Sequence, residues 1–434
     1  MLSPNFPVVH LPHLEQIELP PVRRVRLRHP DAAPVADVEG AVRAAMAPSR
    51  RLADLPRGAR VAIAVGSRGV AEIPVLARTV VAHLKGLGLE PFIVPAMGSH
   101  GGGTAEGQEG VLKKLGVTEA STGAPVRATM ETVEYGATLD GVPCRFDANA
   151  AGADAVVLIA RVKSHTSFDR PIESGLTKMV AVGLGKQAGA RNVHRLGPRG
   201  YIEVLPALAK IALEHSPIAY GIAVVENSAH QLVTIEGVEP EQFLATDERL
   251  LKRAKELLAR LPFAQIDGLI VERIGKEISG TGMDIAISGR ADIRGISNPK
   301  QPFIHKLAVL GLSDETAGNA IGLGVADFTT LKVANALDLV AMYMNSITAT
   351  TAEKARVPIV LPDDRTAIRA VVATCWATEL ERVRLCQIRS SMDLDEILVS
   401  PALFEDLDGS ANGEALSGPE SLAFAADGSL LTRA

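Results

Sequence analysis

The first group of residues that could do chemistry follows a short apolar run. The segment 66–69 (GSRG) comes directly after the run VAIAV that begins at Val61. An arginine at this place can form two parallel hydrogen bonds to a carboxylate or a phosphate. A surface ion pair is the alternative. Arg68 is therefore a candidate substrate-binding residue.

A second segment, residues 96–104 (AMGSHGGGT), follows the apolar run PFIVP. Its consecutive glycines allow backbone N–H groups to approach a phosphate, and a helix capped by Thr104 would add the positive end of its dipole. Gly101 and Gly102 are therefore candidate cofactor-binding residues. His100 has little packing role on such a turn, so it is a candidate acid/base group, with a solvated loop histidine as the alternative.

A third segment, residues 163–194, follows the apolar run AVVLIARV and contains His165, Lys178 and His194. A neutral imidazole is a good ligand for nickel, zinc or copper, and a lysine removed from water can react as an amine. The segment has no His-x-x-x-His or Cys-x-x-Cys spacing, so its local pattern alone does not demand a metal.

The elements that position these segments are strands and helices in alternation. Strand-like runs begin at residues 61, 91, 155 and 221, and later at 266, 307, 337 and 357. Helical spacing or composition predicts helices near 76–87, 240–261, 315–321 and 364–375. This alternation is typical of an α/β fold with mainly parallel sheets flanked by helices.

The length of 434 residues favours two domains. We expect an N-terminal α/β domain over 1–262 and a C-terminal α/β domain over 263–400, because Pro262 ends a long amphipathic helix. Residues 401–434 are expected to be a tail, either docked back on the N-terminal domain or partly disordered. The active site is expected in the cleft between the domains.

Composition narrows the class of function. The net charge of -5 is modest and the basic residues are scattered, which argues against nucleic-acid binding. Cys144, Cys375 and Cys386 lack the paired spacing of disulfides or zinc sites, which favours a reducing compartment. Prolines and charges interrupt every apolar run before 18 residues, so we expect a cytoplasmic protein that does not bind membranes.

Taken together, the segments resemble the lactate racemase family, over most of the chain. The resemblance rests on Ser67 and Arg68, the turn 98–100, the segment around His165, and Lys178 with a histidine sixteen residues later. Members of this family use a nickel-pincer nucleotide, pyridinium-3,5-bisthiocarboxylic acid mononucleotide nickel. The enzymes that make this cofactor would be partners of the chain.

The resemblance implies roles for individual residues. His100 and His165 would be paired acid/base groups, His194 would bind nickel, and Arg68 would hold the substrate carboxylate. Lys178 would bind the cofactor, with its covalent attachment left open, because the stretch between His165 and Lys178 is longer and poorer in glycine than in the lactate enzymes.

Further residues are implicated in the same way. Gly175 and Thr177, beside the lysine, are expected to contact the cofactor. Val65 stands where the lactate-specific branch has an acidic residue, so the resemblance is to a branch other than lactate racemase proper.

A later segment, residues 275–284 (GKEISGTGMD), looks like a signature of a broader branch of the family. Lys276 and Asp284 are candidate substrate-binding residues. An ion pair between Asp284 and Arg290 is a structural alternative. Trp376 is the single tryptophan, and we expect it to pack in the core; the alternative, which the resemblance implies, is packing near the cofactor ring.

The predicted activity is that of an isomerase, a racemase or epimerase of a 2-hydroxy acid such as a sugar acid. Inverting such a carbon breaks an unactivated C–H bond, which requires a cofactor that accepts hydride. Two alternatives stay open: a zinc-dependent hydrolase using His100, His165 and His194, and a non-enzymatic nucleotide-binding regulator.

Overall fold

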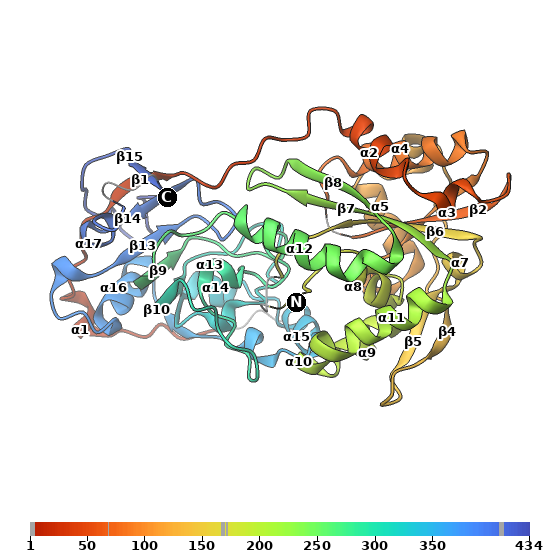
Figure 1. The fold of residues 1–434 in the computed structure, drawn as a ribbon. Helices are drawn as coiled ribbons and strands as arrows, with labels where there is room; N and C mark the ends of the chain where they lie inside the picture. Colours follow the sequence, from red (N-terminus) through yellow and green to blue (C-terminus); the bar gives the residue numbers. More distant parts are fainter. Residues whose placement is uncertain (1–4, 68, 166–169, 171, 408–411) are drawn as a thin grey trace. The chain divides into compact units, whose positions relative to one another are not determined.

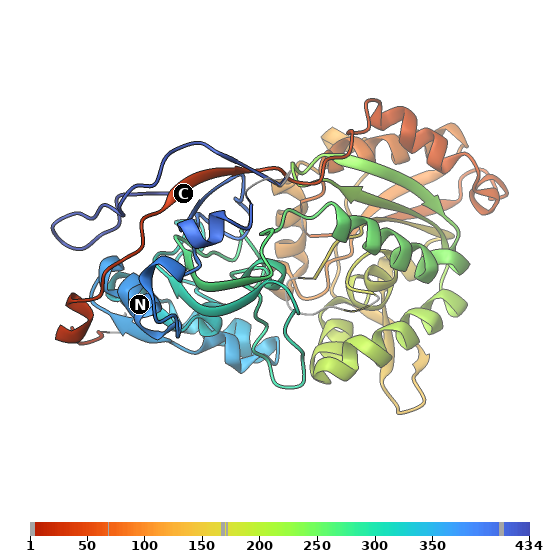
Figure 2. The same ribbon diagram turned by 60° about the vertical axis from the view of Figure 1, so that its left-hand side comes forward.

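The structure is a computed structural model that describes residues 5–67, 69–165, 170, 172–407 and 412–434. The chain forms two compact units (Figures 1 and 2). Unit 1 comprises Met1–His29, His165–Asp169 and Ala259–Ala434, and unit 2 comprises Pro30–Ser164 and Arg170–Leu258. Each unit contains a mainly parallel sheet flanked by helices, which confirms the predicted fold class.

The sheet of unit 2 has the strand order β3-β2-β6-β7-β8. Its strands are β2 (Arg60–Val65), β3 (Glu90–Pro95), β6 (Ala155–Arg161), β7 (Ile218–Glu226) and β8 (Leu232–Val238). All neighbours are parallel except β7 and β8. The strands predicted at 61, 91, 155 and 221 are confirmed. A separate hairpin is formed by β4 (Thr132–Ala137) and β5 (Pro143–Asp147).

Alternate residues of each central strand face two separate cores, because side chains alternate across a strand. In β2, Val61 and Ile63 belong to the core covered by α2 (Val38–Met46) and α4 (Ile73–Gly86). Ala62 and Ala64 belong to the opposite core. That core is covered by α8 (Leu176–Lys178), α9 (Lys186–His194), α11 (Leu205–His215) and α12 (Phe243–Glu256).

The sheet of unit 1 has the strand order β12-β11-β10-β9-β13-β14-β1-β15. The parallel strands are β12 (Ile359–Leu361), β11 (Phe328–Thr330), β10 (Phe303–Val309), β9 (Gln265–Val271) and β13 (Leu385–Ile388). The antiparallel strands are β14 (Glu396–Val399), β1 (Arg23–Leu27) and β15 (Gly413–Ala415). Residues of the first strand thus lie in unit 1, whereas the sequence pattern grouped them with 30–262.

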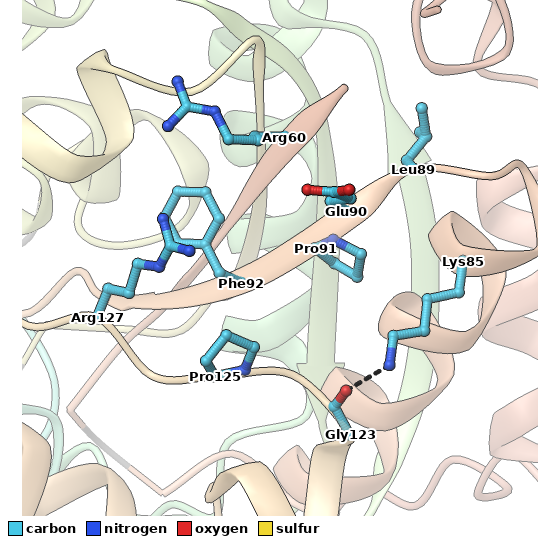
Figure 3. A pocket seen from close by; sticks show the side chains of 9 residues that line it. All are labelled: Arg60, Lys85, Leu89, Glu90, Pro91, Phe92, Gly123, Pro125 and Arg127. Atoms are coloured by element: carbon cyan, nitrogen blue, oxygen red, sulfur yellow. Dashed lines mark hydrogen bonds between the residues drawn. The ribbon is translucent and has the colours of Figure 1, made fainter. Parts of the chain in front are cut away.

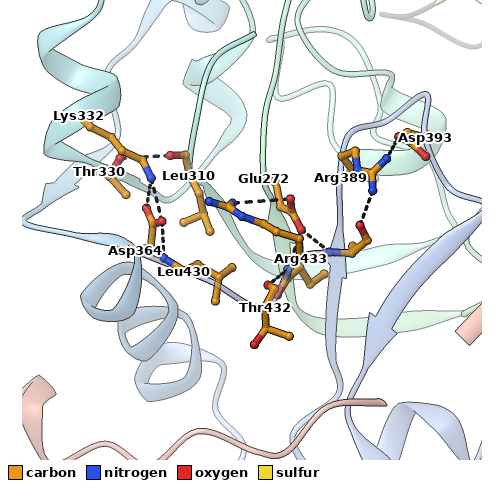
Figure 4. A network of polar contacts seen from close by, with 12 residues as sticks. Glu272, Leu310, Thr330, Lys332, Asp364, Arg389, Asp393, Leu430, Thr432 and Arg433 are labelled. Carbon is orange, nitrogen blue, oxygen red and sulfur yellow. Dashed lines mark hydrogen bonds and ion pairs between the residues drawn. The ribbon is translucent and has the colours of Figure 1, made fainter. Parts of the chain in front are cut away.

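The C-terminal residues are docked on unit 1 through a polar network (Figure 4). The carboxylate of Glu272, just after β9, accepts hydrogen bonds from the backbone N–H of Ala434 at 2.5 Å and from Gln387 at 2.7 Å. Arg389 donates to the carbonyl of Ala434 at 2.9 Å. Strand β15 pairs with β1, so the tail contacts the unit that contains residues 259–407.

Two predictions of secondary structure in unit 1 are wrong. The run LDLVAMYM, expected as a strand, lies largely in the helix α15 (Leu339–Thr348), whose first turn is capped by Asp338. In a short apolar run, periodicity does not distinguish a strand from a helix. Here the cap formed by Asp338 favours the helix. Residues 315–321, expected as a helix, form turns.

The other helices of unit 1 include α13 (Ile285–Ser288), α14 (Leu331–Asn335), α16 (Asp364–Thr374) and α17 (Pro401–Phe404). Helix α16 confirms the prediction at 364–375. Across the described residues of both units, the helices are either too short or too polar to cross a membrane.

Candidate functional site

The predicted glycine-rich turn follows β3 and leads into α5 (Ala105–Lys114). Thr104 caps this helix, because its hydroxyl accepts the N–H of Gly107 at 3.1 Å. Gly101 has φ 66°, and a Cβ there would lie 2.6 Å from the backbone N of Gln108, so only glycine fits. A Cβ at Gly102 would meet nothing within 4 Å. The turn therefore exposes backbone at Gly102, as a cofactor phosphate would require.

His100 is exposed on this turn and contacts a side chain from the neighbouring strand end. Its Nδ1 forms a hydrogen bond with the hydroxyl of Ser67, which follows β2. The contact fixes the orientation of the ring. Arg68, the predicted carboxylate clamp, lies outside the described residues.

Lys178 and His194 converge on the ring of Tyr201. Lys178 ends α8, and its Nζ lies 5.8 Å from the ring centroid of Tyr201 and donates to the carbonyl of Glu173 at 3.1 Å. His194 ends α9, and its ring stacks on Tyr201 with centroids 5.7 Å apart. The described helical run between them includes a π-helical stretch, η2 (Met179–Gly183), a feature that is frequent at functional sites.

The surroundings keep His194 neutral. Burial, and secondarily the positive charge of Lys178, lower the pKa of His194 from 6.5 to about 4. Burial also raises the pKa of Tyr201. At neutral pH the imidazole therefore carries a lone pair, which is the form that binds a metal ion. The ammonium of Lys178 and the neutral imidazole of His194 thus both lie against the ring of Tyr201 in unit 2.

Gly175 and Thr177 form a turn around a buried carboxylate. Asp247 of α12 accepts the N–H of Leu176 at 3.0 Å and that of Thr177 at 2.7 Å. A Cβ at Gly175, where φ is 94°, would lie 2.1 Å from Asp247. Burial raises the pKa of Asp247 to about 6. These amides are thus already occupied by an anion, and the two residues support Lys178 by shaping the start of its helix.

His165 is half-buried and lies four residues after the end of β6. Its contacts assign it to unit 1, whereas His100 belongs to unit 2. The pairing of the two histidines as acid/base groups stays a prediction.

The segment 275–284 follows β9 in unit 1. Lys276 is exposed, and its ammonium donates to the side-chain oxygen of Asn345 on α15. Asp284 caps α13 by accepting the N–H of Ala286 at 2.9 Å. Lys354 is buried nearby; burial lowers its pKa to about 8, while the charge of Asp284 opposes the shift.

Arg290 has a structural role with a partner that the sequence did not indicate. Its guanidinium forms an ion pair with Asp327 at 2.8 Å and donates to the carbonyl of Ile304. Asp327 also accepts the N–H of Leu307 at 2.8 Å. The pair therefore fixes the loop that precedes β11.

The expected core packing of Trp376 is wrong. Its side chain is 84% exposed and lies against His305, with ring centroids 4.3 Å apart. Both residues line a hollow with Gln265 and Phe303, at the amino ends of β9 and β10. The residue lies in a turn after α16 at φ 64°, which directs it outward. The segment 275–284 follows the opposite, carboxyl end of β9.

A second hollow, in unit 2, is lined by Arg60, Lys85 and Arg127 around Phe92 (Figure 3). Arg60 and Glu90 begin β2 and β3, so this hollow lies at the amino ends of the strands. Ligand sites of parallel sheets form at the carboxyl ends, where the turn of His100 lies. The hollow is thus separate from the candidate site.

The zinc alternative lacks structural support within the described ranges. Among those residues, no group of three or more His, Cys, Asp or Glu side chains is placed to hold a metal ion. Within the part of the chain that the structure describes, His100, His165 and His194 therefore do not come together as three ligands of one metal ion. A single histidine ligand to a metal that is held mainly by its own organic cofactor is compatible with this arrangement.

Several residues of the site carried no sequence signal of their own. Ser67 was part of the matched motif, but its contact with His100 required the parallel pairing of β2 and β3. Asp247 and Lys354 lie far along the chain from the motifs they support, and Tyr201 follows His194 by seven residues without belonging to the motif. In the sequence, only the spacing typical of a helix cap, or a charged residue within an apolar stretch, could have indicated these residues.

Comparisons with known proteins were informative only at the level of structure. No family model and no curated protein match the chain. The structure is similar to that of the lactate racemase apoprotein from Thermoanaerobacterium thermosaccharolyticum, with a TM-score of 0.44 and 13% sequence identity. The match covers 83% of this chain and 96% of that one. At this identity and TM-score the match does not assign a family or an activity to this chain.

Proposed function

We propose that the chain is an isomerase that racemises or epimerises a 2-hydroxy acid by proton-coupled hydride transfer, with a nickel-pincer nucleotide as cofactor. The observation that carries the proposal is the convergence of Lys178 and His194 on Tyr201 in surroundings that keep the imidazole neutral. A reactive amine and a metal-binding imidazole are the two groups that such a cofactor needs from the protein.

The residues of unit 2 fit this group. His194 would ligate nickel as a neutral imidazole, and Lys178 would hold the cofactor, covalently or by charge. The open space beside Gly102 and the start of α5 suit its phosphate. When bound, the cofactor would accept the hydride from the substrate carbon and return it to either face.

The side chains of the protein would handle the proton and the carboxylate. His100, oriented by Ser67, would take the hydroxyl proton of one enantiomer, and His165 would serve the other. Arg68 would bind the carboxylate, and Lys276 and Asp284 would bind the remaining oxygen atoms of the substrate. A substrate with several hydroxyl groups, such as a sugar acid, would use these last two residues more fully than lactate.

The direct test is to express the chain together with enzymes that make the cofactor. We expect bound nickel by elemental analysis, absorbance in the near ultraviolet or visible range, and deuterium exchange at C2 across a panel of 2-hydroxy acids that includes aldonates. The proposal would be contradicted if protein fully loaded with the cofactor catalysed deuterium exchange at C2 in none of these acids.

The paired histidines allow a stereochemical test. The test compares His100→Ala and His165→Ala in single-turnover experiments with one pure enantiomer. The variant that lacks the base serving that enantiomer should fail to form the keto acid. The other variant should form it but return mainly the starting enantiomer. Each loss should reduce racemisation by roughly 10²–10⁴-fold. His215→Ala, at the exposed end of α11, is the matched control, and near wild-type racemisation by both variants would refute the assignment.

A further inference from the structure

A lysine that the proposed mechanism does not use is completely buried in unit 2. The side chain of Lys186 has 0% exposure. Its Nζ donates to the carbonyl of Pro95 at 2.6 Å and to the side-chain oxygen of Gln108 at 2.9 Å. It also forms an ion pair with Asp147, itself fully buried, at 2.9 Å. Three oxygen atoms from three elements therefore surround one ammonium group.

Gln108 extends these contacts to the turn that carries His100. Its side-chain NH2 donates to the carbonyl of Gly98 at 2.8 Å and to that of His100 at 3.3 Å. Together, Lys186 and Gln108 hold the carbonyls of residues 95, 98 and 100. The backbone on both sides of Ser99 is thus fixed from inside the protein.

Lys186 also lies midway along the helical run of the cofactor-binding residues, eight positions after Lys178 and eight before His194. The turn touches this run directly, because the N–H of Gly98 donates to the carbonyl of Gly183 at 3.1 Å. The two segments that carry the proposed chemistry are therefore joined at Lys186.

The backbone conformation and the charge of Lys186 indicate that its contacts fix the positions of the surrounding segments and do not mainly add stability. Lys186 has φ 55°, a left-handed conformation that a residue with a side chain adopts at an energetic cost. Burial lowers its pKa, and the charge of Asp147 opposes that shift. Buried ion pairs contribute little stability compared with apolar side chains of similar size, but they can specify one arrangement.

We infer that Lys186, Gln108 and Asp147 are positioning residues that fix the turn of His100 relative to the helical run carrying Lys178 and His194. The inference rests on the proposed function for the roles of those three residues. The link between the turn and the run is measurable without any activity.

The main test replaces Gln108 with methionine, which has similar volume but cannot donate to the two carbonyls. Amide hydrogen exchange at His100 and Gly103 should become about tenfold faster, because one or two hydrogen bonds are lost. The NMR signals of the His100 ring should shift. In loaded enzyme, kcat should fall about 10–100-fold with little change in KM, because a misplaced acid/base group affects the chemical step.

A second variant separates the role of the side-chain oxygen of Gln108, which accepts from Lys186, from that of its NH2 group, which donates to the turn. Gln108→Glu retains an oxygen that can accept from Lys186, but it loses the donor to the turn. It should show the same faster exchange at His100 and Gly103 while the fold is kept. Thr79→Val is the matched control, because it removes another buried side-chain bond to a carbonyl in unit 2, that of Val75 at 2.8 Å.

The outcomes distinguish this inference from the proposed function. Unchanged exchange at His100 and Gly103 and an unchanged ring signal in both Gln108 variants would overturn the inference, even if the wild-type protein racemises hydroxy acids. Faster exchange in the variants, without racemisation by loaded wild-type protein, would support the inference and refute the proposed function. If Gln108→Met does not fold, Gln108→Glu decides by the same readouts.

Discussion

His194 provides a prediction that needs neither cofactor nor substrate. We expect the metal-free protein to lose stability between pH 7 and pH 4.5, and His194→Gln to remove part of that loss. The folded-state pKa of His194 is lowered from 6.5 to about 4. As the pH falls through this window, the unfolded chain takes up a proton at His194 before the folded protein does. The contribution is therefore present above pH 6.5 and is lost as the pH falls towards 4.

The magnitude follows from the two pKa values. A shift of one pKa unit corresponds to about 1.36 kcal/mol. The shift of His194 from 6.5 to about 4 should therefore make the free energy of unfolding fall by about 2 kcal/mol between pH 7 and pH 4.5, after allowance for partial exposure. Lys178→Met should reduce this loss only in part, because burial is the larger cause of the shift and the charge of Lys178 the smaller.

The assay is urea unfolding followed by circular dichroism at several pH values, for the wild type and His194→Gln. The difference between their free energies of unfolding should narrow by about 2 kcal/mol at the acidic end. His215→Gln controls for the removal of a histidine as such. A difference that stays constant from pH 7 to pH 4.5 would refute the reasoning, because His194 would then not be desolvated beside Lys178.

The remaining predictions address the same site. Lys178→Ala should abolish any covalent cofactor adduct in intact-mass measurements, and an unchanged adduct mass would exclude this lysine as the attachment point. His194→Ala should lower nickel content much more than it lowers the thermal midpoint; equal nickel in variant and wild type would count against the ligand assignment. Ser67→Ala should reduce kcat about fivefold, since it removes one hydrogen bond that orients His100, and full activity would show that the contact is dispensable. For Asp247, burial raises the pKa from 3.8 to about 6, so the sign is opposite to that of His194. Relative to Asp247→Asn, the free energy of unfolding of the wild type should rise by about 2 kcal/mol as the pH falls from 7 to 4.5, and a fall measured by urea unfolding would contradict the burial of this carboxyl.

Much of unit 2 could be predicted because its signals are local. The strands at 61, 91, 155 and 221 are continuous apolar runs, and Thr104 caps α5 as its position before a helical stretch indicates. The order of these strands in one parallel sheet brings Ser67 and His100 together, which explains why motif residues after neighbouring strands meet.

The parts that could not be predicted depend on partners distant in sequence. Trp376 was expected in a core because tryptophan is mostly buried, but the turn after α16 directs it to solvent. Lys186 gave no pattern, since its three partners come from different parts of the chain. The run 337–344 has an apolar composition that fits both a strand and a helix, and the Asp338 cap settles it.

The pairing of β1 with β14 has a consequence for the order in which the chain folds. Arg23 lies opposite Val399, so this part of unit 1 closes a loop that contains nearly the whole polypeptide. During synthesis, residues 30–258 are all available long before β14 emerges, so unit 2 can fold while unit 1 is still incomplete. Contacts between residues so distant in sequence form slowly, because the entropy of closing the loop must be overcome first. Until then the edge of β1 is without its partner strand, and the nascent chain is most exposed to aggregation in this interval.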